Sequence, residues 1–256
     1  MFKAASIQLW MGEEDKSQRI ERVEALLDQA KGSSLVILPE IWNIGYFSFD
    51  LYSKEAETTH GEIAQRMSRK AKEHGCYLHS GSFVEIENGN LYNTSLLFDP
   101  DGRQIARYRK IHLFGYGSQE SQILSRGKEV VVVETRLGKI GMCTCYDLRF
   151  PELFRIMLSK GAELFLVTSG WPYPRLEHWL MFNRIRAIEN SAFLISSNCV
   201  GKMRGFQFCG HSMMVDPWGT ILASGGDEEC IVRAEIDLQK VSSVRNEFPA
   251  VRDRIL

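Results

Sequence analysis

The chain changes from strand to helix within residues 141–152, which read GMCTCYDLRFPE. The preceding segments 130–133 and 137–142 are apolar and β-branched with glycine at the joint, which predicts two strands. Residues 149–160 predict a helix, with Pro151 in the first turn, where a missing N–H costs little. Cys145 therefore lies at the end of a buried strand and faces a helix start, whose field favours a thiolate. A nucleophile can work at such a position.

The bulk composition is that of a globular protein. The 256 residues are 44% apolar and 25% charged, and a chain of this length buries a large core without disulfides or metals. The formal net charge of −1 argues against nucleic acid or an anionic membrane as the main partner. No apolar run approaches the roughly 20 residues that a membrane span needs.

The cysteines and the N-terminus indicate the cell compartment. The six cysteines, at positions 76, 143, 145, 199, 209 and 230, lack C-x-x-C spacing and clustered histidines, so neither a zinc site nor a disulfide framework is expected. Residues 1–9 alternate like a first strand and lack the apolar core of a signal peptide. We expect a protein of the reducing cytoplasm.

Strand-like and helix-like segments alternate along the chain without a linker or repeat, so we expect a single domain over residues 1–256 with a C-terminal tail from about 240. The predicted helices cover residues 20–30, 62–74 and 178–190. The predicted strands cover residues 35–38, 77–84, 91–98, 105–110, 164–168, 193–197 and 231–236, and a hairpin covers 212–223. Because hairpins argue against a purely parallel sheet, we predict an α/β layered sandwich with antiparallel pairs.

Three side chains at strand ends are candidates for chemistry. Glu40 ends the apolar strand 35–38, where a carboxylate is costly unless it faces a polar cleft. Lys110 lies in a segment in which basic and apolar residues alternate. Taken singly, Glu40 and Lys110 also fit solvated loop or strand charges, and Cys145 fits a small buried side chain. Only their combination favours a catalytic interpretation.

Three segments resemble the signatures of the nitrilase superfamily of carbon–nitrogen hydrolases, in the order of that family: 38–40 (LPE), 108–113 (YRKIHL) and 145–152 (CYDLRFPE). Further matching segments are 119–121, 171–172, 186–190, 210–212 and 216–219. The resemblance covers nearly the whole chain. It implies a four-layer α-β-β-α sandwich with mixed sheets, and Glu40, Lys110 and Cys145 as a catalytic triad.

The resemblance also implies a mechanism. Cys145 would attack an amide carbonyl and form a thioester, and Glu40 would act as general base. Lys110 would favour the thiolate and, with the backbone N–H of Tyr146, stabilise the oxyanion. Glu120 matches a second glutamate that helps to position Lys110. No metal or organic cofactor is expected.

Residues 171–175 and 186–190 look most like the ω-amidase and deaminated-glutathione-amidase branches, whose substrates are small amides that bear a carboxylate. Arg175 or Arg204 could bind that carboxylate as a bidentate fork. Trp171 and Tyr173 would close the pocket. Tyr46 either lines the same cleft or is a core aromatic.

Alternatives stay open at this point. An N-carbamoyl amino acid or amine hydrolase would use the same triad, and a non-catalytic binding protein could share the fold. Arg149 and Glu152 flank residues 150–151 and suit a helix start and a salt bridge. The family usually forms homodimers or larger assemblies, and residues 153–158 and 247–252 suit subunit contacts.

Overall fold

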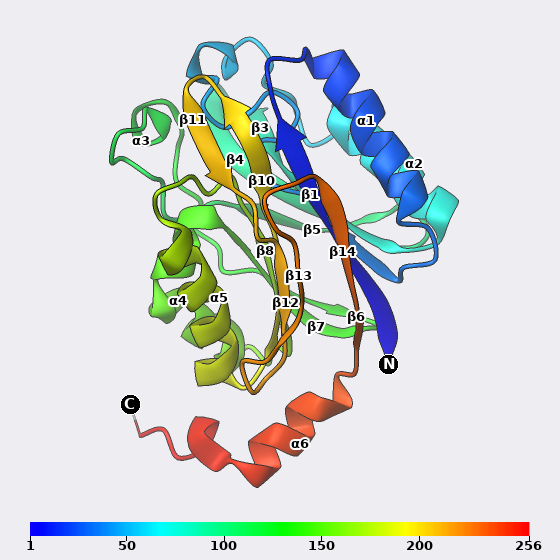
Figure 1. Cartoon of the computed structure of the whole chain (residues 1–256), viewed down its shortest axis with the longest axis vertical. Helices are drawn as coiled ribbons and strands as arrows, with labels where there is room; N and C mark the ends of the chain where they lie inside the picture. The colour runs from blue at the N-terminus through cyan, green and yellow to red at the C-terminus, as the bar shows by residue number, and fades with distance from the viewer. Residues whose placement is uncertain (256) are drawn as a thin grey trace.

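The computed structural model describes residues 1–255, which form two mixed β-sheets packed between layers of helices (Figure 1). Within these residues, sheet one has eight strands: β11 (Phe206–Cys209), β10 (Cys199–Met203), β1 (Phe2–Met11), β2 (Leu35–Ile37), β3 (Tyr77–Glu87), β4 (Asn90–Phe98) and β5 (Gln104–Arg109) in spatial order, with β14 (Cys230–Ile236) also paired to β1. Sheet two of the described chain has six: β13 (Ile221–Ser224), β12 (Met213–Val215), β9 (Phe193–Ser197), β8 (Leu164–Thr168), β7 (Gly138–Thr144) and β6 (Val132–Thr135). This is the expected α-β-β-α sandwich.

The short strand β2 shows why the central strands are continuously apolar. Leu35 and Ile37 belong to the core between the two sheets. Val36 and Leu38 belong to the second core, under the helices on the outer face of sheet one. Successive side chains of a strand point to opposite faces. A strand that is buried on both faces is therefore apolar along its whole length.

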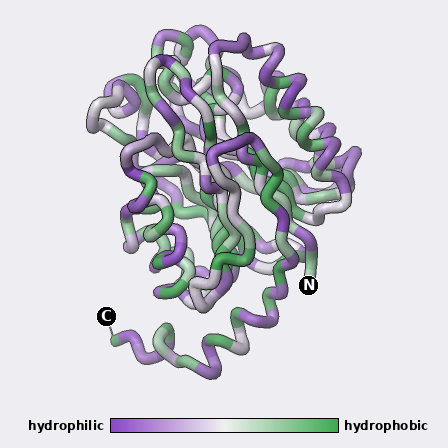
Figure 2. Tube along the Cα trace, in the orientation of Figure 1, coloured by the Kyte–Doolittle hydropathy of each residue, from purple (hydrophilic) through white to green (hydrophobic). Residues whose placement is uncertain are grey.

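Helices cover the outer face of each sheet. α1 (Lys16–Gln29) and α2 (Glu62–His74) lie on sheet one, and α4 (Pro151–Ser159) and α5 (Leu176–Asn190) lie on sheet two (Figure 1). The hydrophobic colour of Figure 2 gathers on the strands at the centre, and hydrophilic residues mark the outer sides of the helices. α1 starts at Asp15, whose carboxylate accepts the Gln18 N–H at 2.8 Å as an N-cap.

Most predicted elements are present, with four differences. The expected strand at 130–133 begins only at Val132 and continues to Thr135. The expected helix at 149–160 is divided into a 3-10 helix, Cys145–Arg149, and α4, which starts at Pro151. The hairpin of β10 and β11 and the C-terminal helix α6 (Gln239–Glu247) were not predicted.

The C-terminal segment extends beyond the sandwich (Figure 1). α6 buries Val241 and Val244. The Arg245 guanidinium holds it by donating to the backbone oxygens of Ala162 and Asn190 at 3.0 and 3.2 Å. Among residues 1–255, no helix combines the length and apolar character of a membrane span.

The ends of strands from both sheets meet at one place. The Thr168 hydroxyl, at the end of β8, donates to the Leu38 carbonyl oxygen beyond β2 at 2.8 Å. The Glu40 N–H donates to the Ser169 carbonyl oxygen at 3.2 Å. Side chains that follow β2, β7 and β8 are therefore brought together at the seam between the sheets.

Candidate active site

Glu40 lies at this seam and is fully buried. One carboxylate oxygen, Oε1, accepts from the Lys110 ammonium and the Asn93 amide, both at 2.8 Å. The other, Oε2, accepts the Gly170 N–H at 2.9 Å. The next residue, Ile41, has a φ of +40°, so the chain turns sharply after the carboxylate. The donors fix the orientation of the Glu40 side chain.

Lys110 follows β5 and is also fully buried. Its Nζ lies 2.8 Å from Glu40 Oε1 and 2.9 Å from both carboxylate oxygens of Glu120. Burial lowers the pKa of Lys110, but the two carboxylates outweigh this effect and raise the pKa well above its ordinary value. The two glutamates therefore favour the charged form of Lys110.

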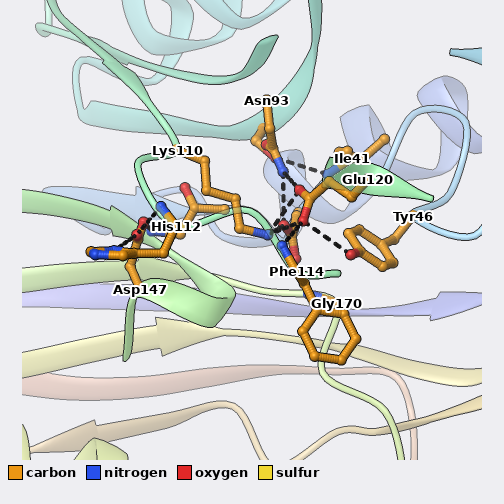
Figure 3. A network of polar contacts seen from close by, with 12 residues as sticks. Ile41, Tyr46, Asn93, Lys110, His112, Phe114, Glu120, Asp147 and Gly170 are labelled. Carbon is orange, nitrogen blue, oxygen red and sulfur yellow. Dashed lines mark hydrogen bonds and ion pairs between the residues drawn. The ribbon is translucent and has the colours of Figure 1, made fainter. Parts of the chain in front are cut away.

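Glu120 is the first residue of the short helix α3 (Glu120–Ile123). Its carboxylate accepts from the Tyr46 hydroxyl at 3.1 Å, the Phe114 N–H at 2.7 Å and the Asn93 amide at 3.0 Å (Figure 3). Burial raises the pKa of Glu120, with Lys110 acting in the opposite direction. The sequence predicted that Glu120 contacts Lys110, and the structure places the two in an ion pair.

Asn93 was missed by sequence reasoning. It lies on β4, and its Nδ2 donates to Glu40 and Glu120 together. Figure 3 shows the amide pointing at the carboxylates. The available signal was an asparagine inside a strand, where this residue type is depleted, at a position that alternation places in the interior.

Cys145 ends β7 and begins the 3-10 helix, with a φ of +48°. Only 8% of the residue is exposed, and that part faces the pocket described below. Burial raises the pKa of the Cys145 thiol well above its ordinary value, and the adjacent Glu40 carboxylate adds to this effect, whereas Lys110 opposes it. Burial and Glu40 together outweigh the Lys110 ammonium, so the protonated thiol is favoured and attack requires a base such as Glu40.

Asp147 connects the turn at Cys145 to the segment that contains Lys110 through hydrogen bonds. Its carboxylate accepts the Thr144 N–H at 2.9 Å and the Tyr108 hydroxyl at 2.6 Å. The other oxygen accepts the His112 N–H at 2.9 Å and lies 2.7 Å from the His112 ring nitrogen (Figure 3). His112 is thus engaged with Asp147.

A pocket opens onto Cys145. Half of its lining residues are aromatic. Its lining residues are Tyr46, Phe47, Phe114, Cys145, Tyr146, Arg149, Gly170, Trp171, Pro172 and Arg175. The predicted pocket residues Tyr46, Trp171 and Arg175 are in this wall, and so is Tyr146.

Two arginines give this pocket its charge. The Arg149 guanidinium lies 4.8 Å from the centre of the Trp171 ring, and that of Arg175 lies 5.5 Å from the Phe114 ring. Among the residues that the structure describes, no carboxylate pairs with either arginine. The expected salt bridge between Arg149 and Glu152 is therefore wrong, because the guanidinium stacks in the pocket wall instead.

Two other residues expected to contact the substrate are not among the residues that line this pocket. The Tyr173 hydroxyl donates to Asp227 at 3.0 Å and does not line the pocket. Arg204 lies at the β10–β11 turn, where it pairs with Asp50 at 3.3 Å outside the pocket of Cys145. Both residues are in surface segments whose path the sequence pattern did not reveal.

The comparison with protein families assigns the chain. Residues 3–246 match the model of the carbon–nitrogen hydrolase family. The chain belongs to this family. It is accordingly a hydrolase that acts on carbon–nitrogen bonds other than peptide bonds.

Individual relatives agree with this assignment. The chain is 40% identical to the 2-oxoglutaramate amidase of Bacillus subtilis, over 93% of this chain and 91% of that protein. It is 35% identical to human omega-amidase NIT2, over 99% and 95% of the two chains. The crystal structure of Saccharomyces cerevisiae Nit3, a nitrilase superfamily member, superposes with a TM-score of 0.92 at 31% identity and covers 100% of this chain and 97% of its own.

Proposed function

We propose that this hydrolase is an ω-amidase that removes ammonia from the side-chain amide of a short dicarboxylic acid monoamide, with 2-oxoglutaramate as the preferred substrate. The names of its relatives support this proposal. The observation that carries it is the pair of arginines, Arg149 and Arg175, in the wall of the pocket that holds Cys145. A cation without a carboxylate partner is suited to bind the free carboxylate of such a substrate.

The walls of the pocket also favour such a substrate. The aromatic rings that stack on Arg149 and Arg175 hold the guanidinium planes in place, so little side-chain entropy is lost on binding. A substrate carboxylate at the arginines leaves the amide at the other end of the molecule, toward the cysteine.

In the proposed acylation step, the Glu40 carboxylate takes the proton of the Cys145 thiol as the sulfur attacks the amide carbon. The raised pKa of the thiol makes this base necessary. The carbonyl becomes an oxyanion that receives stabilisation from the Lys110 ammonium and the Tyr146 N–H. Collapse of the tetrahedral intermediate breaks the C–N bond, and Glu40 returns the proton to the departing ammonia.

In the proposed deacylation step, water attacks the thioester carbon. Glu40 takes a proton from that water, the C–S bond breaks, and the sulfur leaves with the proton that Glu40 returns. The net reaction converts an amide and water into a carboxylate and ammonium. Glu120 acts through Lys110, because its carboxylate binds the ammonium at 2.9 Å.

A substrate panel tests the proposal. Purified protein is incubated with 2-oxoglutaramate, glutaramate, succinamate and N-carbamoyl-β-alanine, and ammonia is measured. We expect the first three to be hydrolysed, 2-oxoglutaramate with the highest kcat/KM, and Cys145→Ala to be inactive. The proposal is contradicted if none of the ω-amides releases ammonia, or if the N-carbamoyl compound is clearly preferred.

A matched pair of substrates tests the role of the arginines. Arg149→Met should raise KM for glutaramate on the order of tenfold or more, since a charged hydrogen bond is lost. It should change KM for the uncharged amide butyramide little. Equal effects on both substrates would mean that Arg149 supports the pocket wall without binding a carboxylate.

We further propose that the protein forms a homodimer through α5. Met181, Ile185 and Ile188 lie at helical spacing on this helix and are 52%, 45% and 46% exposed. Such a stripe is apolar surface that a second copy can bury. In size-exclusion chromatography with light scattering, Ile185→Glu should give a monomer where the natural chain is a dimer. A natural chain that elutes as a monomer rejects this proposal.

A further inference from the structure

Asn93 contacts all three members of the buried charge cluster formed by Glu40, Glu120 and Lys110. Its Nδ2 donates to Glu40 Oε1 at 2.8 Å and to Glu120 Oε1 at 3.0 Å. Its backbone oxygen accepts the Lys110 N–H at 2.9 Å. The Asn93 Nδ2 and the Lys110 Nζ thus close a ring in which each nitrogen bridges the same two carboxylate oxygens.

The amide can have only one orientation. Carboxylate oxygens that bind an ammonium are acceptors, so the Asn93 NH₂ group must face them. The consequence is that Asn93 Oδ1 is buried and has no hydrogen-bond partner among residues 1–255. A buried oxygen without a hydrogen-bond partner lowers stability and needs an explanation. Here the explanation is that both carboxylates require the NH₂ group as a donor, so the Oδ1 atom faces the other way.

We propose that Asn93 is a positioning residue that keeps Glu40 available as a base by preventing it from sharing a proton with Glu120. This inference rests on the proposed function, in which Glu40 takes the thiol proton. The Asn93 NH₂ group lies between the two Oε1 atoms and donates to both of them. It satisfies both oxygens without neutralising either one.

The net charge of the buried cluster explains why a residue in the role of Asn93 is required. Two carboxylates and one ammonium are buried together, with zero exposed area on each residue. Two carboxylates that approach each other share a proton, as in the aspartic-protease dyad, and the proton-bearing carboxyl is then no base. Lys110 neutralises one charge only. Among residues 1–255, the other titratable groups on which the cluster charges act include Tyr46, Tyr52, Cys145 and Cys199.

The test is the pH profile of kcat/KM for Asn93→Ala with 2-oxoglutaramate. Two N–H donors to the carboxylates are lost, which disfavours their ionised forms, so the acid limb should move to higher pH. At neutral pH, kcat/KM should fall about 10- to 100-fold. Part of the loss should be recovered at higher pH, where the shared proton leaves. An unchanged profile, whatever the fall in kcat, overturns the inference.

Asn183 provides a matched control. It is a fully buried asparagine of α5 that also has an orphaned Oδ1, and its Nδ2 donates to the Trp179 carbonyl oxygen at 2.7 Å. Asn183→Ala should lower stability without moving the acid limb. Should Asn93→Ala fail to fold, Asn93→Ser, which retains one donor, is measured instead and should give a smaller shift in the same direction.

Glu40→Gln separates the two proposals. An active Glu40→Gln enzyme refutes the proposed base and this inference with it. If Glu40→Gln is inactive and the Asn93 variants keep the natural pH profile, only the role of Asn93 is refuted. An inactive Glu40→Gln enzyme together with the shifted profile supports both.

Discussion

Left-handed backbone occurs at Cys145 and at the residue that follows Glu40. Ile41, directly after Glu40, has a φ of +40°, and Cys145 has a φ of +48°. This region costs a non-glycine residue about 1–3 kcal/mol, and it persists where the surroundings over-determine it. At Cys145 the surroundings include Asp147, which binds the Thr144 N–H at 2.9 Å. The turn places the sulfur at the pocket while its neighbours stay buried.

Removing the buried ammonium tests the charge balance directly. Lys110→Gln leaves Glu40 and Glu120 without a counter-charge, so the free energy of unfolding at neutral pH should fall by roughly 3–5 kcal/mol. Urea denaturation measures it. Lys70→Gln is the control, since Lys70 pairs with Asp28, which is 54% exposed, and its loss should cost about 1 kcal/mol or less. Equal losses would mean that burial of the pair is unimportant.

His79 predicts how stability depends on pH. Burial lowers the pKa of His79 from the ordinary 6.5 to about 3. Between these values the unfolded chain binds a proton that the folded chain does not, so the free energy of unfolding decreases as the pH falls. From pH 7 to 5, the natural chain should lose about 2 kcal/mol more than His79→Gln. The exposed His60→Gln should follow the natural chain; identical curves for all three proteins would contradict this.

At the scale of elements, an irregularity in β3 shapes the turn that carries Glu40. The pairing of β3 with β4 shifts register between His79 and Ser82. Gly81, inside this bulge, has a φ of +67°, and a Cβ there would lie 2.2 Å from the Pro39 carbonyl oxygen. The Ser82 hydroxyl accepts the Ile41 N–H at 3.0 Å. The bulge therefore brings β3 close enough to hold the residues on both sides of Glu40.

Gly81→Ala tests this arrangement. The substitution should lower the free energy of unfolding by at least the 1–3 kcal/mol or so of left-handed strain, and the clash with Pro39 should also reduce kcat. Thermal unfolding and ammonia release measure the two effects. Gly89→Ala isolates the strain, because Gly89 has a φ of +77° but open space around its Cβ position. A Gly81→Ala enzyme as active as Gly89→Ala would show that close approach is not required.

Local patterns were sufficient for the elements that bury an uninterrupted face. α2, β8 and β9 have the predicted bounds, because their apolar residues repeat at the period of one structure. The β10–β11 hairpin was missed because its turn, at Arg204 and Gly205, separates short strands of mixed polarity. α6 has few buried residues, so its period was weak.

The residues of the site also fall into those that local motifs predict and those that depend on the fold. Glu40, Lys110 and Cys145 were predicted from the motifs that contain them, and the first two form an ion pair at 2.8 Å. Asn93 and Arg149 were not assigned to the site, since their importance depends on which strands and loops become neighbours. A pattern along the chain marks Asn93 as an unusual residue inside a strand, but it does not reveal that this asparagine bridges carboxylates 53 and 27 residues away.

At the scale of the whole molecule, hydroxyl groups join the two sheets. The Ser6 hydroxyl of β1 donates to the Ser196 carbonyl oxygen of β9 at 2.7 Å. The Ser197 hydroxyl of β9 donates to the Ile7 carbonyl oxygen of β1 at 2.6 Å. With the bond from Thr168, these contacts fix how one sheet lies on the other. Apolar packing alone is less directional.

Thr168→Val tests one of these contacts with a side chain of similar shape. The Leu38 carbonyl oxygen loses its donor in a buried place, so the free energy of unfolding should fall by about 1–3 kcal/mol. kcat should fall as well, because Leu38 precedes Glu40 by two residues. Thr135→Val is the control, since the Thr135 hydroxyl bonds to Gly138 within a single hairpin at 2.8 Å. It should retain full activity; if both variants do, the contact has no part in aligning the site.

The seam location of the active site gives catalysis a mechanical dependence. Glu40 and Lys110 follow strands of sheet one, whereas Cys145 follows a strand of sheet two. Sliding of one sheet over the other by about a bond length would therefore separate the proton acceptor from the sulfur while every helix and strand persisted. Under graded urea or hydrostatic pressure, ammonia release should cease before circular dichroism reports any loss of secondary structure. The rate of ammonia release therefore reports whether the two sheets are correctly aligned.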